Sequence, residues 1–216
     1  MIRLIFISLL MSITLCSCKR SERNSKTKAL KINFTQDPQN FDPRKASDLA
    51  SASLQFFISE GLTKSTPAAS AAPGLAEKID VSSDGLVYTF HIRDCYWSDG
   101  TPLTAQDFET SWKSSLDPHF PCYNAFLLFP IKGARGAKMG ETPLSEVAIE
   151  SLDSKTLQVT LETPTPYFLE ITSFCTLFPV PSHLVRQHCY ENPEDYPSLG
   201  PYYISKYQQG ALIQLS

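Results

Sequence analysis

Residues 85–116 constrain the fold more than any other stretch of this 216-residue chain, because several local signals follow one another there. Residues 86–93 alternate between an apolar face and a mixed face, which is typical of a half-buried strand. The apolar face consists of Leu86, Tyr88, Phe90 and Ile92. Ser98-Asp99-Gly100 then predicts a tight turn, since glycine tolerates a positive φ and aspartate can hydrogen-bond its own backbone.

A helix is predicted directly after this turn. Thr104 is a suitable N-cap, and Asp107 places an acidic side chain in the first turn, where the helix dipole favours it. Side chains at intervals of three and four residues then predict one buried stripe. That stripe consists of Phe108, Ser111, Trp112 and Ser115. The stretch therefore predicts a strand, a tight turn and a capped helix in succession.

The rest of the chain predicts short elements separated by turns. The expected helices are residues 48–59, 165–172 and 182–189, and the expected strands include residues 29–35, 147–150 and 156–161. Residues 200–204 are expected to begin a final strand, and residues 211–215 to pair with it or to start another. Gly61 is expected to end the first of these helices, because glycine is favoured at helix C-termini. Residues 63–72 are rich in Ser, Ala and Pro and have no periodicity, which predicts a loop.

Composition and motifs argue against several classes of function. A hydrophobic content of 42% is enough for the core of one domain or two small ones, and a net charge of −3 gives no footprint for nucleic acid. The sequence has no GxSxG elbow, no glycine-rich phosphate loop, no HExxH motif and no CxxC or Cys/His metal spacing. Asp99 and Asp107 are explained by turn formation and capping rather than by acid–base chemistry. We therefore expect a binding protein, with no catalytic residues, metal or cofactor.

Residues 1–17 resemble an export signal of the lipoprotein type. Arg3 precedes an apolar core at residues 4–15, which is too short for a stop-transfer helix of roughly 20 residues. Leu15-Cys16-Ser17-Cys18 resembles a bacterial lipobox, which predicts cleavage before Cys18 and a lipid on its thiol. The alternative is an ordinary signal peptide in which Cys18 has no special role.

A lipid on Cys18 would hold the chain at the membrane, because each buried methylene contributes roughly 0.8 kcal/mol. Residues 18–29 are polar and non-periodic, which predicts a flexible tether and an extracytoplasmic, lipid-anchored location. That location permits disulfides, and four further cysteines allow three pairings. They are Cys95, Cys122, Cys175 and Cys189. The alternative is that these cysteines are small buried core residues.

The sequence of residues 84–118, DGLVYTFHIRDCYWSDGTPLTAQDFETSWKSSLDP, resembles the signature region of the extracytoplasmic solute-binding proteins of peptide and nickel ABC importers. The oligopeptide-binding members are the most similar. Shorter matches extend the resemblance over residues 30–216. They are Asp37-Pro38, Asp42-Pro43, Glu60-Gly61-Leu62, Pro73-Gly74-Leu75-Ala76-Glu77 and residues 151–170.

This resemblance implies an α/β fold of the periplasmic-binding-protein type, a type II clamshell whose two lobes hold the ligand between them. It implies that the chain carries the N-terminal lobe, with a mixed sheet, and is truncated before the second lobe. Within this lobe, residues 30–59 and 182–216 are expected to form a partial core. Residues 60–181 are expected to form a subdomain inserted into that core.

The resemblance also implies which residues contact the ligand. Leu49 matches the position whose main chain pairs with a bound peptide, and Ser47 and Asp48 flank it. Tyr123 matches a tyrosine that lines the cleft, and Phe174 falls where some relatives have a polar pocket residue. The alternative is that Leu49 and Tyr123 are an ordinary helix-start residue and an ordinary core residue.

The implied function is that of a lipid-anchored substrate-binding component of an ABC-type oligopeptide importer. Its partners would be an oligopeptide, the ABC permease, and the membrane through the lipid on Cys18. Most side-chain contacts with the peptide belong to the family's second lobe, so we expect the chain alone to bind peptide weakly or not at all. Two other functions stay open, a non-transport surface lipoprotein scaffold and a nickel- or metallophore-binding relative.

Overall fold

The structure, a computed structural model, describes residues 32–184 and 192–216. Almost all of them belong to one compact unit, Phe34–Ser216, which is described here by itself. The expected signal at residues 1–17, the tether at 18–29 with Cys18, and Cys189 lie outside the described residues. Within the described ranges, no helix has both the length and the apolar character needed to cross a membrane.

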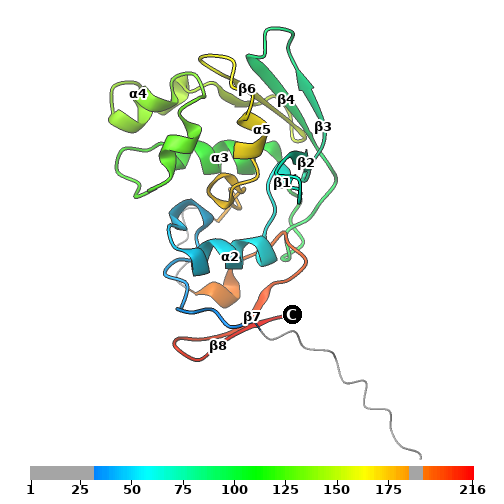
Figure 1. The fold of residues 1–216 in the computed structure, drawn as a ribbon, viewed down its shortest axis with the longest axis vertical. Coiled ribbons are helices and arrows are strands. Elements are labelled where there is room, and N and C mark those ends of the chain that lie inside the picture. The colour runs from blue at the N-terminus through cyan, green and yellow to red at the C-terminus, as the bar shows by residue number, and fades with distance from the viewer. Residues whose placement is uncertain (1–31, 185–191) are drawn as a thin grey trace, which may run out of the picture. The chain divides into compact units, whose positions relative to one another are not determined.

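A four-stranded antiparallel sheet forms the largest regular element of this unit (Figure 1). Its strands, in spatial order, are β3 (Ala76–Val81), β4 (Val87–Ile92), β6 (Thr156–Thr160) and β5 (Ile149–Ser151). β4 is the predicted alternating strand, and Tyr88, Phe90 and Ile92 are buried as expected. The β5–β6 hairpin is also confirmed, with Glu150 opposite Gln158.

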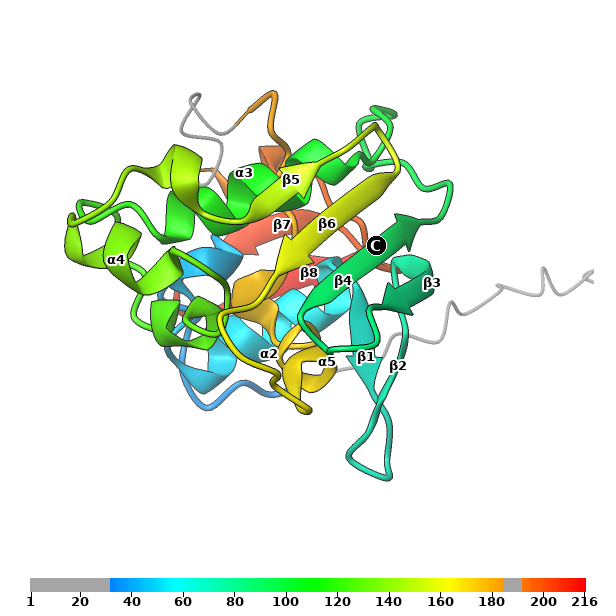
Figure 2. The same ribbon diagram turned by 90° about the horizontal axis from the view of Figure 1, so that it is seen from above.

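Helix α3 (Ala105–Ser115) packs against β5 and β6, beneath the sheet in the view of Figure 2. The predicted stripe is buried along its full length, from Phe108 to Ser115. Asp107 accepts a hydrogen bond from the N–H of Thr104 at 2.9 Å, so the predicted cap forms. The same carboxylate accepts from the indole of Trp97 at 3.3 Å and from the N–H of Ser182 at 2.9 Å. One buried side chain thus joins the turn, the helix and a distant segment.

The remaining elements are short. The helices are α2 (Leu49–Ile58), α4 (Ala134–Met139) and α5 (Phe168–Ile171), and two hairpins pair β1 (Thr63–Ser65) with β2 (Ala71–Pro73) and β7 (Ile204–Gln208) with β8 (Leu212–Leu215). Single 3-10 turns occur at Pro43–Lys45, Ala125–Leu128, Leu144–Glu146, Cys175–Leu177 and Pro193–Asp195. The helix predicted at residues 48–59 is therefore confirmed to within a residue.

Two main clusters of buried side chains hold these elements together. The larger cluster lies between the sheet and α3 and includes Phe90, Trp112 and Leu157. The second contains Leu54 and Ile58 of α2 together with Tyr196 and Ile204 near the C-terminal hairpin. Because of this second cluster, α2 lies against the β7–β8 region (Figure 1).

Two predictions about strands differ from the structure. Residues 32–35, the described part of the strand predicted at 29–35, are not in a strand, because none of the named strands pairs with them. All pairs between named strands are antiparallel, whereas a mixed sheet was expected. Four of these pairs join strands that follow one another in the chain: β1–β2, β3–β4, β5–β6 and β7–β8. The connections within these pairs are too short for the crossover that parallel pairing requires.

Two further predictions fail around the end of α2. Residues 63–72 are not a loop but contain β1 and most of β2, which lack periodicity because each is only three residues long. Gly61 does not end α2, since Ser59 is the C-cap. A Cβ at Gly61 would lie 2.6 Å from the carbonyl oxygen of Thr172, so glycine is needed there for close backbone approach.

We expect replacement of Asp107 to destabilise the fold. In Asp107→Ala the buried indole of Trp97 and the partly buried N–H groups of Thr104 and Ser182 lose their acceptor, so the free energy of unfolding should fall by about 3 kcal/mol. Urea unfolding of the whole chain measures this change. The control is Asp94→Ala, because the Asp94 side chain is 94% exposed and its ion pair with Lys155 contributes little. Equal stability of the two variants would contradict the assignment.

Candidate functional site

The first turn of α2 presents a backbone donor to solvent. Asp48 caps the helix, and its carboxylate accepts hydrogen bonds from the N–H of Ser51 at 2.8 Å and from the Ser51 hydroxyl. Leu49 is the first helical residue, and its side chain is 80% exposed. The N–H of a first helical residue has no partner within the helix, and no acceptor pairs with that of Leu49 among the described residues.

The hydrogen bonds of Asp48 also set its protonation. Burial raises the pKa of this carboxyl, but hydrogen bonds from the hydroxyl and N–H of Ser51, the N–H of Gln39 and the side chain of Gln36 together hold the pKa below its ordinary value. Asp48 is therefore a carboxylate at neutral pH and stabilises the N-terminus of α2.

Asn124 brings three segments of the chain together at this site. Its side-chain amide donates to the carbonyl of Ala46 at 3.1 Å and to the hydroxyl of Thr176 at 3.3 Å. The entry to α2, the turn that carries Tyr123, and the 3-10 turn after Phe174 are consequently neighbours. Tyr123 itself is 73% exposed, which rules out the alternative that it is a core residue.

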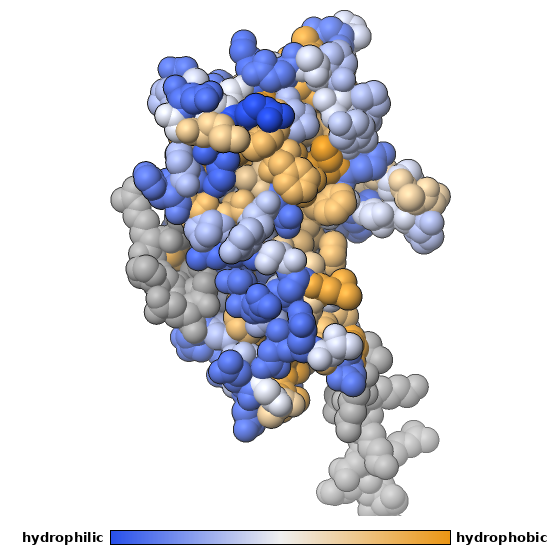
Figure 3. Space-filling view, turned by 60° about the vertical axis from the view of Figure 1, so that its left-hand side comes forward, coloured by the Kyte–Doolittle hydropathy of each residue, from blue (hydrophilic) through white to orange (hydrophobic). Residues whose placement is uncertain are grey.

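An exposed apolar surface results, which we call the apolar face. It consists of Leu49, Phe56, Tyr123, Phe126 and Phe174, each more than half exposed. Leu49 and Phe56 are seven residues apart and so lie on the same side of α2. Figure 3 shows apolar side chains gathered on one side of the molecule. An exposed apolar surface of this kind is typical of a binding site.

A buried ion pair lies in the segment that precedes α2. Arg44 and Asp42 are only 4% and 3% exposed and approach to 2.7 Å. The guanidinium also donates to the hydroxyl of Ser114 at 2.7 Å and lies 4.5 Å from the centre of the Phe120 ring. The sequence analysis missed this pair, although the arginine in Asp42-Pro43-Arg44 is a signal that could have indicated it.

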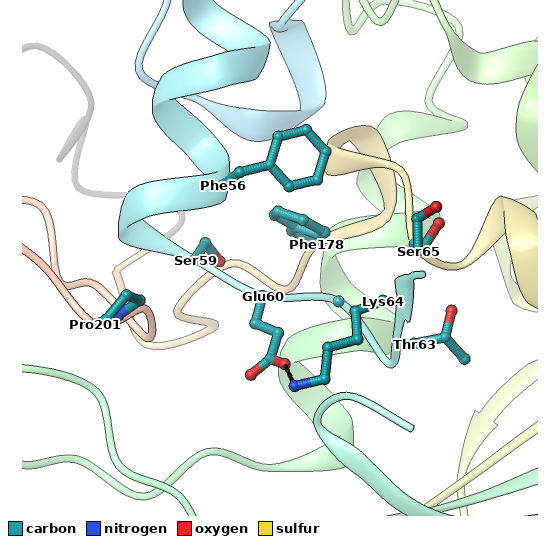
Figure 4. Close-up of a pocket in the computed structure, with 10 residues that line it drawn as sticks. Phe56, Ser59, Glu60, Thr63, Lys64, Ser65, Phe178 and Pro201 are labelled. Carbon is teal, nitrogen blue, oxygen red and sulfur yellow. Dashed lines mark ion pairs between the residues drawn. The ribbon is translucent and has the colours of Figure 1, made fainter. Parts of the chain in front are cut away.

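A groove of about 500 Å³ lies at the other end of α2 (Figure 4). Phe56 and Phe178 form its apolar wall, with their rings edge-to-face at 5.5 Å. Glu60 and Lys64 line it as an ion pair at 2.9 Å, and Glu60 also pairs with Arg93 at 2.7 Å. Sequence reasoning missed the groove because Phe178 is brought to α2 only by the tertiary fold.

The structure therefore brings the predicted site residues into one region. Ser47 and Leu49 are exposed, Asp48 is the N-cap of α2, and Tyr123 lies on a neighbouring turn. Phe174 is exposed next to them, as an apolar contact requires. Their roles in ligand contact stay predictions.

The described cysteines are free thiols. Cys95 is half-buried, whereas Cys122 and Cys175 are buried, and burial raises the pKa of both of these thiols. Each of the three pairings predicted from the sequence would join two of these three cysteines, so none of the three pairings forms, because all three described thiols are free. The part of the chain that the structure describes also has no group of three His, Cys, Asp or Glu side chains placed to hold a metal ion.

A comparison with protein-family models matches residues 70–216, more than half of the chain, to the bacterial extracellular solute-binding proteins, family 5. The chain belongs to this family. A curated family relative is the oligopeptide-binding protein OppA of Bacillus subtilis, which is 39% identical over 199 residues. The match covers 90% of this chain and 36% of the relative, so the chain spans little more than a third of that protein's length.

Solved structures of oligopeptide-binding proteins share the fold. The substrate-binding domain of an oligopeptide ABC transporter from Bacillus anthracis has a TM-score of 0.82 and 29% identity, over 86% of this chain and 36% of that one. OppA of Listeria monocytogenes, solved bound to peptide, has a TM-score of 0.79 and 28% identity, over 82% of this chain and 36% of that one. The predicted α/β fold of the type II periplasmic-binding-protein class is confirmed.

We expect the contribution of Asp48 to stability to depend on pH. Asp48→Ala should lower the free energy of unfolding by about 1 kcal/mol at pH 7, because the cap is lost. The pKa of Asp48 is depressed in the folded state, so its contribution is present above the ordinary value of 3.8 and is lost as the pH falls through the folded pKa. Urea unfolding from pH 7 down to about pH 2.5 should show the difference in the free energy of unfolding between wild type and Asp48→Ala narrowing, with most of the change below pH 3.8.

Asp48→Asn is the matched control, because asparagine caps helices nearly as well as aspartate without a titrating charge. It should retain most of the stability at pH 7. A difference between wild type and Asp48→Ala that stays constant over this pH range would contradict the role of the carboxylate.

Burial of two thiols predicts selective labelling. Iodoacetamide at pH 8 should modify Cys95 well before Cys122 and Cys175, because the buried thiols are both shielded and held protonated. Mass spectrometry of peptides from the briefly treated chain measures the three rates. Denaturation in urea should make the rates similar, and rapid labelling of Cys122 in the native chain would show that the turn carrying Tyr123 is not packed as described.

Proposed function

We propose that this chain supplies one side of the ligand site of a substrate-binding component of a peptide ABC importer. The observation that carries the proposal is the apolar face beside the unpaired N–H of Leu49, in a member of a solute-binding family. Relatives named for oligopeptide binding, and a neighbour solved with peptide, support peptide as the ligand class.

In this proposal an extended peptide lies across the N-terminal end of α2. A peptide carbonyl accepts the hydrogen bond of the Leu49 N–H, as in the addition of a strand. Ser47 and Asp48 flank this contact, and Tyr123 and Phe174 provide apolar surface for the peptide side chains. A site of this kind uses main-chain contacts for affinity and adaptable, hydrated pockets for side chains, so it tolerates many peptide sequences.

The chain alone offers a single surface, so we propose that its own affinity for peptide is low. Each hydrogen bond to the peptide forms in competition with water, and its net contribution is only about 1 kcal/mol. Charged contacts are weak for the same reason, because the dielectric constant near an exposed surface is high. High affinity would require a second surface that closes over the peptide, and closure would give the permease its signal.

The location that we propose is extracytoplasmic, with a lipid on Cys18 and residues 18–29 as a tether. The family description and the sequence of residues 1–17 support it.

We also propose that residues 30–59 and 182–216 form one structural region and residues 60–181 another. The cluster that joins Leu54 and Ile58 to Tyr196 and Ile204 supports this division.

The decisive experiment separates the backbone of Leu49 from its side chain. Proline is favoured at the first helical position, and Asp48 already has the extended backbone, φ −110° and ψ 159°, that precedes proline. Leu49→Pro should therefore keep α2 intact while it removes the N–H. We expect it to abolish the amide chemical-shift changes that wild type shows on titration with a tetrapeptide at about millimolar concentrations.

Leu49→Ala is the matched control, because it keeps the N–H and removes the exposed side chain. It should retain these shift changes with a modest loss of affinity. Circular dichroism establishes that both variants keep their helix content. Equal peptide binding by Leu49→Pro and wild type would contradict the proposal, and tight binding by the chain alone would contradict the requirement for a second surface.

A further inference from the structure

The groove at the C-terminal end of α2 contains a polar group that lacks a partner. Ser59 is 3% exposed, and its hydroxyl is buried without a hydrogen-bond partner among the described residues. Ser59 lines the groove, and Figure 4 shows its hydroxyl on the side that faces Phe178. A buried hydroxyl without a partner is unfavourable, so the groove presents a donor that a ligand could satisfy.

The charges around the groove are unequal. Both oxygens of Glu60 are paired, one with Lys64 at 2.9 Å and the other with Arg93 at 2.7 Å. Two cations therefore surround one carboxylate: Lys64 lines the groove, and Arg93, which lies outside the lining, leaves this group of three charges with a net positive charge. The side chain of Lys64 is 58% exposed, and an ammonium group has three donors, so at least one remains available after the bond to Glu60.

The opposite wall of the groove is apolar. Phe56 and Phe178 hold each other edge-to-face, and the Phe56 side chain is 57% exposed. The volume of about 500 Å³ lies within the range typical of small-molecule sites. The groove thus combines an aromatic wall, a hydroxyl donor and a surplus cation.

We propose that this groove binds the carboxylate end of a ligand whose last side chain is apolar. The carboxylate accepts hydrogen bonds from the ammonium of Lys64 and the hydroxyl of Ser59, and the apolar side chain packs against Phe56 and Phe178. Identification of the ligand as a peptide rests on the proposed function. Binding of a carboxylate and an apolar side chain in the groove does not require that the ligand be a peptide.

Phe56 connects this groove to the proposed peptide contact, because it belongs to both surfaces. Leu49 and Ser59 are ten residues apart along α2, or about 15 Å at the helical rise. An extended peptide spans about 3.3 Å per residue. A peptide that contacts Leu49 and ends in the groove therefore has about four or five residues.

The test compares two forms of one peptide. Ala-Ala-Ala-Phe with a free carboxylate should bind about tenfold more tightly than the same peptide with a C-terminal amide, measured by chemical-shift titration of the whole chain. Lys64→Gln should remove this preference. Lys78→Gln is the matched control, because Lys78 is an exposed lysine paired with Asp80 on β3, and it should leave the preference unchanged.

A second probe, N-acetyl-phenylalanine, separates this inference from the proposed function. Its carboxylate should bind wild type and fail to bind Lys64→Gln, even if peptide binding does not depend on the N–H of Leu49. If the acid and amide peptides bind equally while Leu49→Pro still abolishes peptide binding, the proposed carboxylate site in the groove is wrong. The proposed peptide contact at Leu49 would still stand. Binding of N-acetyl-phenylalanine that is the same in Lys64→Gln would also overturn the proposed carboxylate site.

Discussion

The surface that we assign to the ligand depends on two hydrogen bonds from the buried helix α3. The hydroxyl of Ser111 donates to the carbonyl of Phe178 at 2.7 Å, and the indole of Trp112 donates to the carbonyl of Leu177 at 2.8 Å. All four residues are buried, so the loss of either bond would leave an unsatisfied polar group at a cost of about 1–3 kcal/mol. These bonds fix the segment that carries Phe174 and Phe178, and hence one side of both the apolar face and the groove.

The other side of the apolar face rests on a buried charge. Because Arg44 and Asp42 are almost fully excluded from water, removal of one partner would leave an uncompensated charge. The pair holds the chain that enters α2, and Asn124 joins that chain to Thr176. Three segments distant in sequence are thus held by polar contacts with defined geometry. A rigid surface of this kind suits ligands that bring their own flexibility, since the protein loses little conformational entropy on binding.

The parts of the fold that could be predicted from sequence are those in which local signals agree. β4 and α3 have clear periodicity, a turn with glycine at φ +86° and a capping residue, so they were predicted to within about one residue. β1 and β2 could not be predicted in this way because each is only three residues long, and the role of Gly61 could not because it depends on close approach to the Thr172 backbone. The candidate site also has a predictable part and an unpredictable part. Leu49 and Tyr123 were predicted from the resemblance, whereas the groove could not be predicted because it forms only where Phe178 packs against α2.

The charge pattern along α2 also bears on the direction in which a peptide would lie. The helix dipole by itself favours an anion at the N-terminus and a cation at the C-terminus, by about 0.3–1 kcal/mol each. Here the N-terminal preference is already satisfied by the carboxylate of Asp48, and the charges of Asp42, Arg44, Lys45 and Asp48 sum to zero, so that end has little attraction left for a ligand anion. At the other end, Lys64 and Arg93 exceed the single charge of Glu60 and outweigh the weak opposing dipole. If the ligand is a peptide, as proposed, its carboxylate is therefore better placed toward Lys64 than toward Asp48.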